Sequence, residues 1–137
     1  MNRDKLIVLY KKYELTAEDV FKHAHYLIIT RGGIEKIQAM EKISIEYTVI
    51  KCEKDFCVVK AKAEKNGVFI ETFGSALKGA SHKEGNCNSW YVMEFAEKRA
   101  MSRAILKLTG FYSLGVFGED ESDDFKKNTP TNNGTTK

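Results

Sequence analysis

An alanine stripe in the last third of the chain limits how this protein can fold. Ala96, Ala100 and Ala104 recur every four residues, so they share one face if the segment is helical. Methyl groups at the centre of that face let the helix lie close to a flat partner. Gly110 then ends the pattern in the manner of a helix C-terminus. The sequence therefore predicts a long helix, from about Trp90 to Gly110, whose alanine face packs on other structure.

Basic residues run beside the alanine stripe with the same spacing. Arg99, Arg103 and Lys107 lie along one edge of the predicted helix. Two interpretations are open: solvated charges whose aliphatic stems are buried, or a basic ridge that meets a polyanion. After the helix come a short apolar segment, residues 111–117, and an acidic segment, residues 119–124.

Three strands are predicted before this helix. In the first strand, Ile43, Ile45, Tyr47 and Val49 alternate with polar residues and are expected to face the core. The second strand, residues 56–64, places Cys57, Val59, Ala61 and Ala63 on one face, and residues 68–76 form the third strand. Asn66-Gly67, between the second and third strands, favours a type I′ turn, which requires positive φ at both central positions. The surface expected to receive the alanine stripe is built of small residues: Ala61, Ala63, Gly74 and Ala76. We therefore expect an α+β fold in which a three-stranded antiparallel β-meander packs against the long Ala/Arg-rich helix, a β-β-β-α core.

The first forty residues are expected to form short helices and one further strand. Residues 3–14 suit an amphipathic helix, and the spacing of Thr16 and Asp19 is close to a capping box, which predicts a helix from Ala17. Residues 26–30 have the composition of a strand, and a helix follows the glycines at 32 and 33. Two interpretations of these glycines remain open: a tight corner, or a helix start beside Arg31 whose main-chain N–H groups bind a phosphate.

A loop rich in Gly, Asn, Ser and Lys covers residues 77–89, between the third strand and the long helix. It carries Lys78 and Lys83 and ends at Trp90. Lysine neutralises phosphate and an aromatic ring stacks on any base, so this composition is typical of a single-stranded nucleic-acid site. The alternative is a plain loop in which Trp90 anchors the helix to the core.

Composition excludes several classes of protein. The 137 residues carry a net charge of +3 and contain no apolar run long enough to span a membrane. The first residues lack a secretory signal, so we expect a cytoplasmic protein. We expect one domain over residues 1–125 and a disordered tail over residues 126–137, where periodicity is absent. The basic body and the acidic segment together fit a polyanionic partner.

The reactive residues form no recognisable catalytic or metal site. Cys52, Cys57 and Cys87 are odd in number and scattered, which argues against a disulfide framework. The three histidines and Cys87 match no known zinc spacing. No Ser/His/Asp or Cys/His arrangement stands out. We therefore expect no enzymatic activity, no metal and no other cofactor.

The order of elements resembles that of a family of recombination proteins. The segment AEKRAMSRAILKLTGFYSLGVFGEDES, residues 96–122, is similar to phage single-strand annealing proteins of the Erf and Sak types and to their eukaryotic relatives, the Rad-fifty-two family. These proteins carry an A-x-x-R-A-x-x-R-A helix, a glycine-containing exit and an acidic stretch. In the order of elements the likeness extends over roughly residues 27–124.

The resemblance implies a β-β-β-α fold whose subunits join side by side into rings or filaments that hold single-stranded DNA by its backbone. It implies that Arg99 and Arg103, which match the two arginines of the motif, contact phosphate or fix the neighbouring sheet. Lys60 and Lys62, on the exposed face of the second strand, would add to the same basic track.

The leading expectation is a homo-oligomeric protein that binds and anneals single-stranded DNA during phage-type recombination, without sequence preference. Phage or host recombination proteins are its further expected partners. The alternative is a recombination accessory or protein-interaction module that uses residues 119–124 to contact a basic partner.

Overall fold

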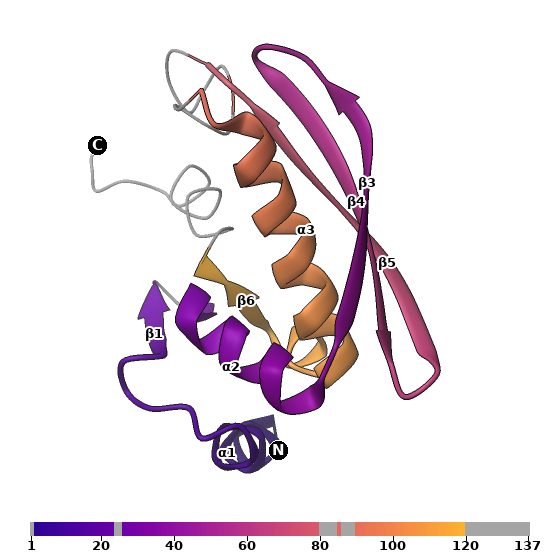
Figure 1. The fold of residues 1–137 in the computed structure, drawn as a ribbon. Helices are drawn as coiled ribbons and strands as arrows, with labels where there is room; N and C mark the ends of the chain where they lie inside the picture. Colours follow the sequence, from indigo (N-terminus) through magenta and orange to yellow (C-terminus); the bar gives the residue numbers. More distant parts are fainter. Residues whose placement is uncertain (1, 24–25, 80–84, 86–89, 120–137) are drawn as a thin grey trace, which may run out of the picture.

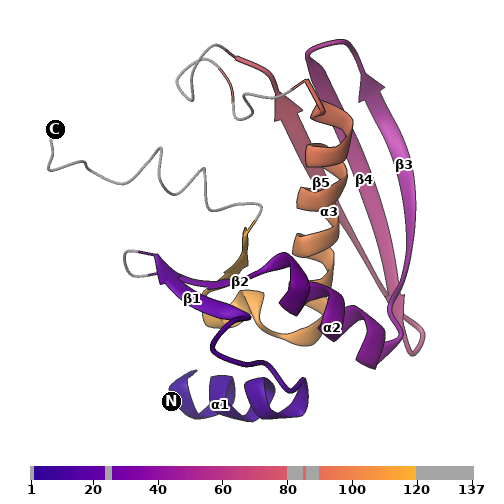
Figure 2. The same ribbon diagram turned by 60° about the vertical axis from the view of Figure 1, so that its left-hand side comes forward.

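One long helix, α3 (Val92–Thr109), runs through the middle of the computed structural model, which describes residues 2–23, 26–79, 85 and 90–119 (Figure 1). On one side of α3 lies the sheet β3-β4-β5, and on the other lie α2 and the small sheet β1-β2-β6 (Figures 1 and 2). The remaining elements, in chain order, are α1 (Asn2–Lys12), β1 (Val20–His23), β2 (Tyr26–Ile29), α2 (Arg31–Glu41), β3 (Ser44–Cys52), β4 (Phe56–Lys65), β5 (Val68–Leu77), the 3-10 helix η1 (Tyr112–Leu114) and β6 (Val116–Gly118).

The predicted meander packed on a helix is confirmed. The strands β3, β4 and β5 pair antiparallel in sequence order. Asn66 and Gly67 form the β4–β5 turn with φ angles of 51° and 82°, both positive as the predicted turn requires. The face of β4 that was expected to point inward is buried over Cys57, Val59, Ala61 and Ala63. The alternation of side chains along β4 therefore correctly predicted which face of this strand points into the core.

The main chains of α3 and β5 touch at Gly74. A Cβ atom on this residue would lie 2.2 Å from the main-chain oxygen of Ala96 and 2.5 Å from the main-chain nitrogen of Ala100. The alanines of the stripe are fully buried, and Thr72 Oγ1 donates a hydrogen bond to the Ala100 carbonyl at 2.6 Å. The small residues on both elements set the distance between helix and sheet.

The two halves of α3 differ in how they are covered. Around its C-terminal half, residues from α1, α2, β2 and β6 join the core, among them Ile29, Ile37 and Val116. The N-terminal half packs on a smaller buried cluster, which comprises Cys57, Val59, Ala76, Val92 and Ala96. Most of the apolar core therefore lies at one end of the molecule.

β3 reaches the core over only part of its length. Ile43 and Ile45 are buried or half-buried, but Tyr47 is 37% exposed and Val49 is 52% exposed. The prediction that all four residues pack on the core is therefore wrong for Tyr47 and Val49. The reason is that α3 lies over β4 and β5, and its contact with β3 is slight.

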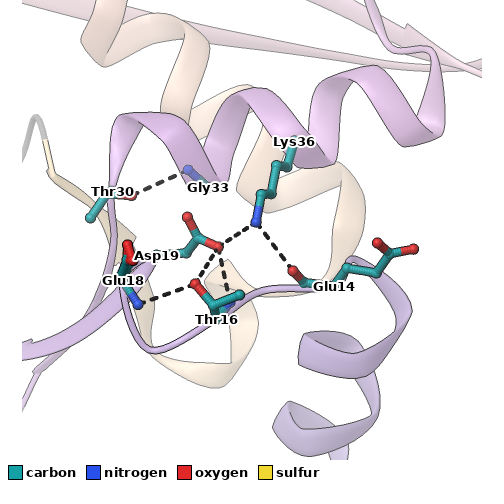
Figure 3. Close-up of polar contacts among 7 residues, drawn as sticks. All are labelled: Glu14, Thr16, Glu18, Asp19, Thr30, Gly33 and Lys36. Carbon is teal, nitrogen blue, oxygen red and sulfur yellow. Dashed lines mark hydrogen bonds and ion pairs between the residues drawn. The ribbon is translucent and has the colours of Figure 1, made fainter.

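Thr16 and Asp19 form a closed polar turn instead of starting a helix (Figure 3). Asp19 Oδ2 accepts hydrogen bonds from the main-chain nitrogen of Thr16 at 2.9 Å and from its Oγ1 at 3.2 Å. The chain then enters β1, which pairs antiparallel with β2. The prediction of a helix from Ala17 is wrong, because the local bonds of a capping box also form in a turn and the β-prone residues that follow find a strand partner.

Lys36 and Gly33 join this turn to α2. Lys36 Nζ lies 2.7 Å from Asp19 Oδ2 and 3.2 Å from the Glu14 carbonyl oxygen (Figure 3). Gly33 lies against Asp19, since a Cβ there would be 2.6 Å from Ile29 Cγ2 and 3.2 Å from Asp19 Cβ. The side chain of Thr30 caps α2 by accepting a hydrogen bond from Gly33 N at 3.2 Å. Both glycines lie in the first turn of α2, and Gly33 permits close packing there.

Asp19 makes the stability of this junction depend on pH. The Lys36 ammonium, followed by the main-chain N–H of Thr16, lowers the pKa of Asp19 below its ordinary value. The stabilisation is present above the ordinary aspartate pKa and is lost as pH falls through the folded-state pKa. We expect Asp19→Asn to lower the free energy of unfolding by about 1 kcal/mol at neutral pH, because Lys36 is partly exposed and solvent screens the pair.

Urea denaturation at several pH values checks this. The difference between the two proteins should shrink as pH falls below about 4, the ordinary aspartate pKa, and vanish once pH is below the lower folded-state pKa of Asp19. Glu18→Gln, which changes an exposed neighbouring carboxylate, is the matched control and should leave stability nearly unchanged. A difference between Asp19→Asn and the unmodified protein that stays constant down to low pH would argue against the ion pair as its source.

Gly74→Ala tests the contact between α3 and β5. The added methyl group meets main-chain atoms that cannot rotate away, so helix and sheet must separate. We expect a loss of about 3 kcal/mol or more in the free energy of unfolding, at the upper end of the cost of overpacking. Thermal and urea denaturation measure it. Gly32→Ala is the control, since the one neighbour within 4 Å of its Cβ would be Thr30 Oγ1 at 3.9 Å. It should be at least as stable as the unmodified protein, because Gly32 lies in α2 and alanine favours a helix over glycine.

Candidate nucleic-acid interface

The two arginines of the A-x-x-R-A-x-x-R-A helix bind the open edge of the meander. Arg99 Nη1 donates to the Ser75 carbonyl at 2.8 Å, and Arg103 Nη1 donates to the Phe73 carbonyl at 2.7 Å. In the antiparallel β4–β5 ladder, alternate carbonyls of β5 point away from β4, toward this edge. Four helical residues rise about 6 Å and two strand residues about 6.8 Å, so the two spacings match.

This geometry gives Arg99 a structural role. Its side chain is only 2% exposed, and its guanidinium lies 5.7 Å from the centre of the Phe95 ring. Of the two roles that the resemblance implies for Arg99, its burial opposes contact with phosphate and its hydrogen bond supports fixation of the sheet. Arg103 is half-buried on the same edge, and Lys107 is exposed with Nζ 5.2 Å from the Tyr112 ring.

The outer face of the meander, which points away from α3, is not uniformly basic. Lys60 Nζ lies 3.6 Å from Glu71 Oε2. Lys62 Nζ lies 5.1 Å from the Phe69 ring, and Lys62 has Glu46 and Glu71 as its register partners on the two neighbouring strands. Carboxylates therefore balance the lysines of this face. The prediction that Lys60 and Lys62 continue a basic track from Arg99 is wrong, because the helix and the outer face lie on opposite sides of the sheet.

Trp90 lies between two lysines at one end of the meander. The residue is 59% exposed, and Lys78 Nζ and Lys54 Nζ lie 4.2 Å and 5.5 Å from the centre of its ring. Lys54 belongs to the β3–β4 turn, and Lys78 follows β5 and donates its main-chain N–H to the Asp55 carbonyl at 2.7 Å. We call Lys54, Lys78 and Trp90 the lysine–tryptophan cluster. The exposure of Trp90 shows that the alternative, an anchor in the core, is wrong.

Sequence reasoning identified Trp90 and Lys78 but missed Lys54. The predicted topology could have indicated Lys54. In a three-stranded meander, the turn after the first strand and the end of the third strand lie at the same end of the sheet. Lys83 falls outside the described residues, so its predicted place beside Trp90 stays a prediction.

Arg31 lies apart from this cluster. It belongs to α2, on the other side of α3 from the meander (Figure 1). Its main-chain nitrogen donates to Glu119 Oε1 at 3.0 Å, while its side-chain Nε is buried without a hydrogen-bond partner in the described part of the chain. At the start of α2 the main-chain donors of Arg31 and Gly33 are therefore bound by the protein's own side chains. Residues 120–124 of the acidic segment lie outside the described residues.

Within the described ranges, no group of three His, Cys, Asp or Glu side chains is placed to hold a metal ion. The same part of the chain contains no helix with the length and apolar character to cross a membrane. His25, His82, Cys87 and the tail over residues 126–137 lie outside it.

No family model, curated protein or solved structure matches this chain. The resemblance of residues 96–122 to annealing proteins therefore stays a prediction from the sequence.

Arg99→Ala tests the structural role of the arginine. The substitution removes a hydrogen bond to a strand-edge carbonyl and empties the space beside Phe95. We expect the free energy of unfolding, measured with urea, to fall by about 2–3 kcal/mol. Lys98→Ala is the matched control, because Lys98 is the neighbouring basic residue and also approaches the Phe95 ring, at 5.3 Å. Equal stability of the two variants would contradict the role assigned to Arg99.

Proposed function

We propose that this protein binds single-stranded DNA without sequence preference and that the lysine–tryptophan cluster is a contact site for the strand. The observation that carries the proposal is the exposed Trp90 ring with Lys78 Nζ 4.2 Å and Lys54 Nζ 5.5 Å from its centre. An exposed ring stacks on any unpaired base, and adjacent ammonium groups neutralise phosphates. On binding, the lysines leave the ring for phosphates and a base takes their place.

Further stacking positions continue along β5 on the outer face. Phe69 and Phe73 are both exposed, and residues of the same parity share one face of a strand. Their Cα atoms are separated by roughly 14 Å at 3.4 Å per residue. Because carboxylates balance the lysines there, this surface contributes stacking and little phosphate neutralisation. We therefore expect a modest salt dependence, with a slope of about −1.4 for two phosphate contacts on a single strand.

The role in annealing and phage-type recombination rests on the sequence resemblance, and self-association is part of the same proposal. The two edges of the meander differ in a way that supports one mode of assembly. Arg99 and Arg103 occupy the β5 edge, whereas β3 is an edge strand with Val49 and Ile50 exposed. We propose that subunits join through β3, because unpaired strand edges with apolar side chains favour pairing with another chain.

Substitution of Trp90 provides the most direct test. We expect Trp90→Ala to weaken binding of a fluorescently labelled single-stranded oligonucleotide by about 5- to 150-fold, which corresponds to 1–3 kcal/mol of lost stacking. Trp90→Phe keeps a ring and should retain most of the affinity. Fluorescence anisotropy measures binding to single- and double-stranded DNA at two salt concentrations, and light scattering gives the mass of the free protein so that affinity is expressed per subunit.

The contribution of the lysines to DNA binding can be measured from how the affinity changes with salt concentration. Lys78→Ala should reduce the magnitude of the salt slope by about 0.7, the value for one phosphate contact on a single strand. Lys11→Ala removes an equal charge from the exposed surface of α1 and should leave the slope unchanged. Equal or tighter binding to duplex DNA, or full affinity in Trp90→Ala, would rule out the proposed site.

A further inference from the structure

Cys52 and Cys57 face each other across the end of the β3–β4 hairpin. They are register partners, and their Sγ atoms lie 3.4 Å apart. Glu53 N donates to the Phe56 carbonyl at 2.7 Å, so residues 53 and 56 form the hydrogen-bonded pair at the turn and the two cysteines form the next, non-hydrogen-bonded pair. Opposed side chains come closest in such a pair, so a disulfide can close with only a small movement of the strands.

We propose that Cys52 and Cys57 are a redox-active thiol pair that forms a reversible disulfide with a low-molecular-weight disulfide, such as oxidised glutathione, as the oxidant. The two thiols differ in accessibility, since Cys52 is exposed and Cys57 is buried. Burial, with smaller effects from Cys52 and the Glu94 carboxylate, raises the pKa of the Cys57 thiol to about 11. Cys52 is therefore the thiol that meets the oxidant first.

The reaction proceeds by two thiol–disulfide exchanges. The Cys52 thiolate attacks one sulfur of oxidised glutathione, which forms a mixed disulfide and releases one glutathione thiolate. Cys57 then loses its proton to solvent and attacks the Cys52 sulfur, which releases the second glutathione. In total two protein thiols are oxidised to one disulfide, and one oxidised glutathione is reduced to two glutathione molecules.

The bond encloses the turn that carries Lys54. Closing the Sγ–Sγ distance from 3.4 Å to the bonded length of about 2.05 Å draws the two strands together beside this turn. Because Lys54 Nζ lies 5.5 Å from the Trp90 ring, the movement changes the environment of that ring. The disulfide itself is independent of the proposed function, whereas any effect on DNA binding rests on it.

Trp90 is the only tryptophan of the chain, so its fluorescence reports this turn without DNA. The test uses the full chain with Cys87→Ser, incubated with mixtures of oxidised and reduced glutathione under native conditions. We expect an intact mass lower by two hydrogens, a peptide map that joins Cys52 to Cys57, and a parallel change in Trp90 fluorescence, all reversed by dithiothreitol. Accumulation of a stable glutathione adduct, or reaction only after addition of urea, would overturn the proposal.

Two variants separate the steps. Cys57→Ala should stop at the mixed disulfide on Cys52, and Cys52→Ser, at an exposed position that tolerates substitution, should not react while folded. If oxidised glutathione reacted rapidly with the folded Cys52→Ser variant, the proposal that Cys52 reacts before Cys57 would be overturned. Oligonucleotide binding is then measured on both redox forms. If the disulfide forms and neither form binds, the proposed function fails and the thiol pair stands.

Discussion

The contact between the main chains of α3 and β5 at Gly74 determines where the rest of the structure can lie. With no side chain at this position, the helix approaches until a Cβ there would be 2.2 Å from the Ala96 carbonyl oxygen. The buried alanine face follows from this distance, and so do the two arginine hydrogen bonds, because a guanidinium at the helix edge reaches a strand-edge carbonyl only when helix and strand are close. Loss of this approach would leave both the alanine face and the edge of β5 without their partners.

The arginines show how a basic repeat can serve structure instead of ligand binding. Arg99 and Arg103 follow the same four-residue period as the alanines, which on sequence alone also describes a ridge for a polyanion. The strand beside them changes this interpretation, since the rise between the arginines matches the spacing of alternate carbonyls on β5. Side chains that donate hydrogen bonds to these carbonyls also protect an edge strand from pairing with other chains. The charge of the two arginines is thus used within the fold, and the proposed contact with DNA is at the lysine–tryptophan cluster instead.

The sequence predicted what depends on local pattern and missed what depends on placement. The turn at Asn66-Gly67, the buried face of β4 and the end of α3 at Gly110 were predicted because each is determined by neighbouring residues. The strand β1 was missed because its residues are extended only in the presence of β2. The exposure of Val49, the burial of Arg99 and the approach of Lys54 to Trp90 all depend on which strands the helix covers, and periodicity contains no information about that choice.

The uneven core separates the stable part of the molecule from the part proposed to react. Around the C-terminal half of α3, Ile105 and Phe111 pack among residues from several elements, whereas the N-terminal half rests on a small cluster that includes Cys57 and Val92. Local opening is easiest where few apolar contacts must be broken. The lysine–tryptophan cluster and the thiol pair both lie at this thinly packed end, so a base can displace the lysines from Trp90, or a disulfide can close, while the main core keeps its packing.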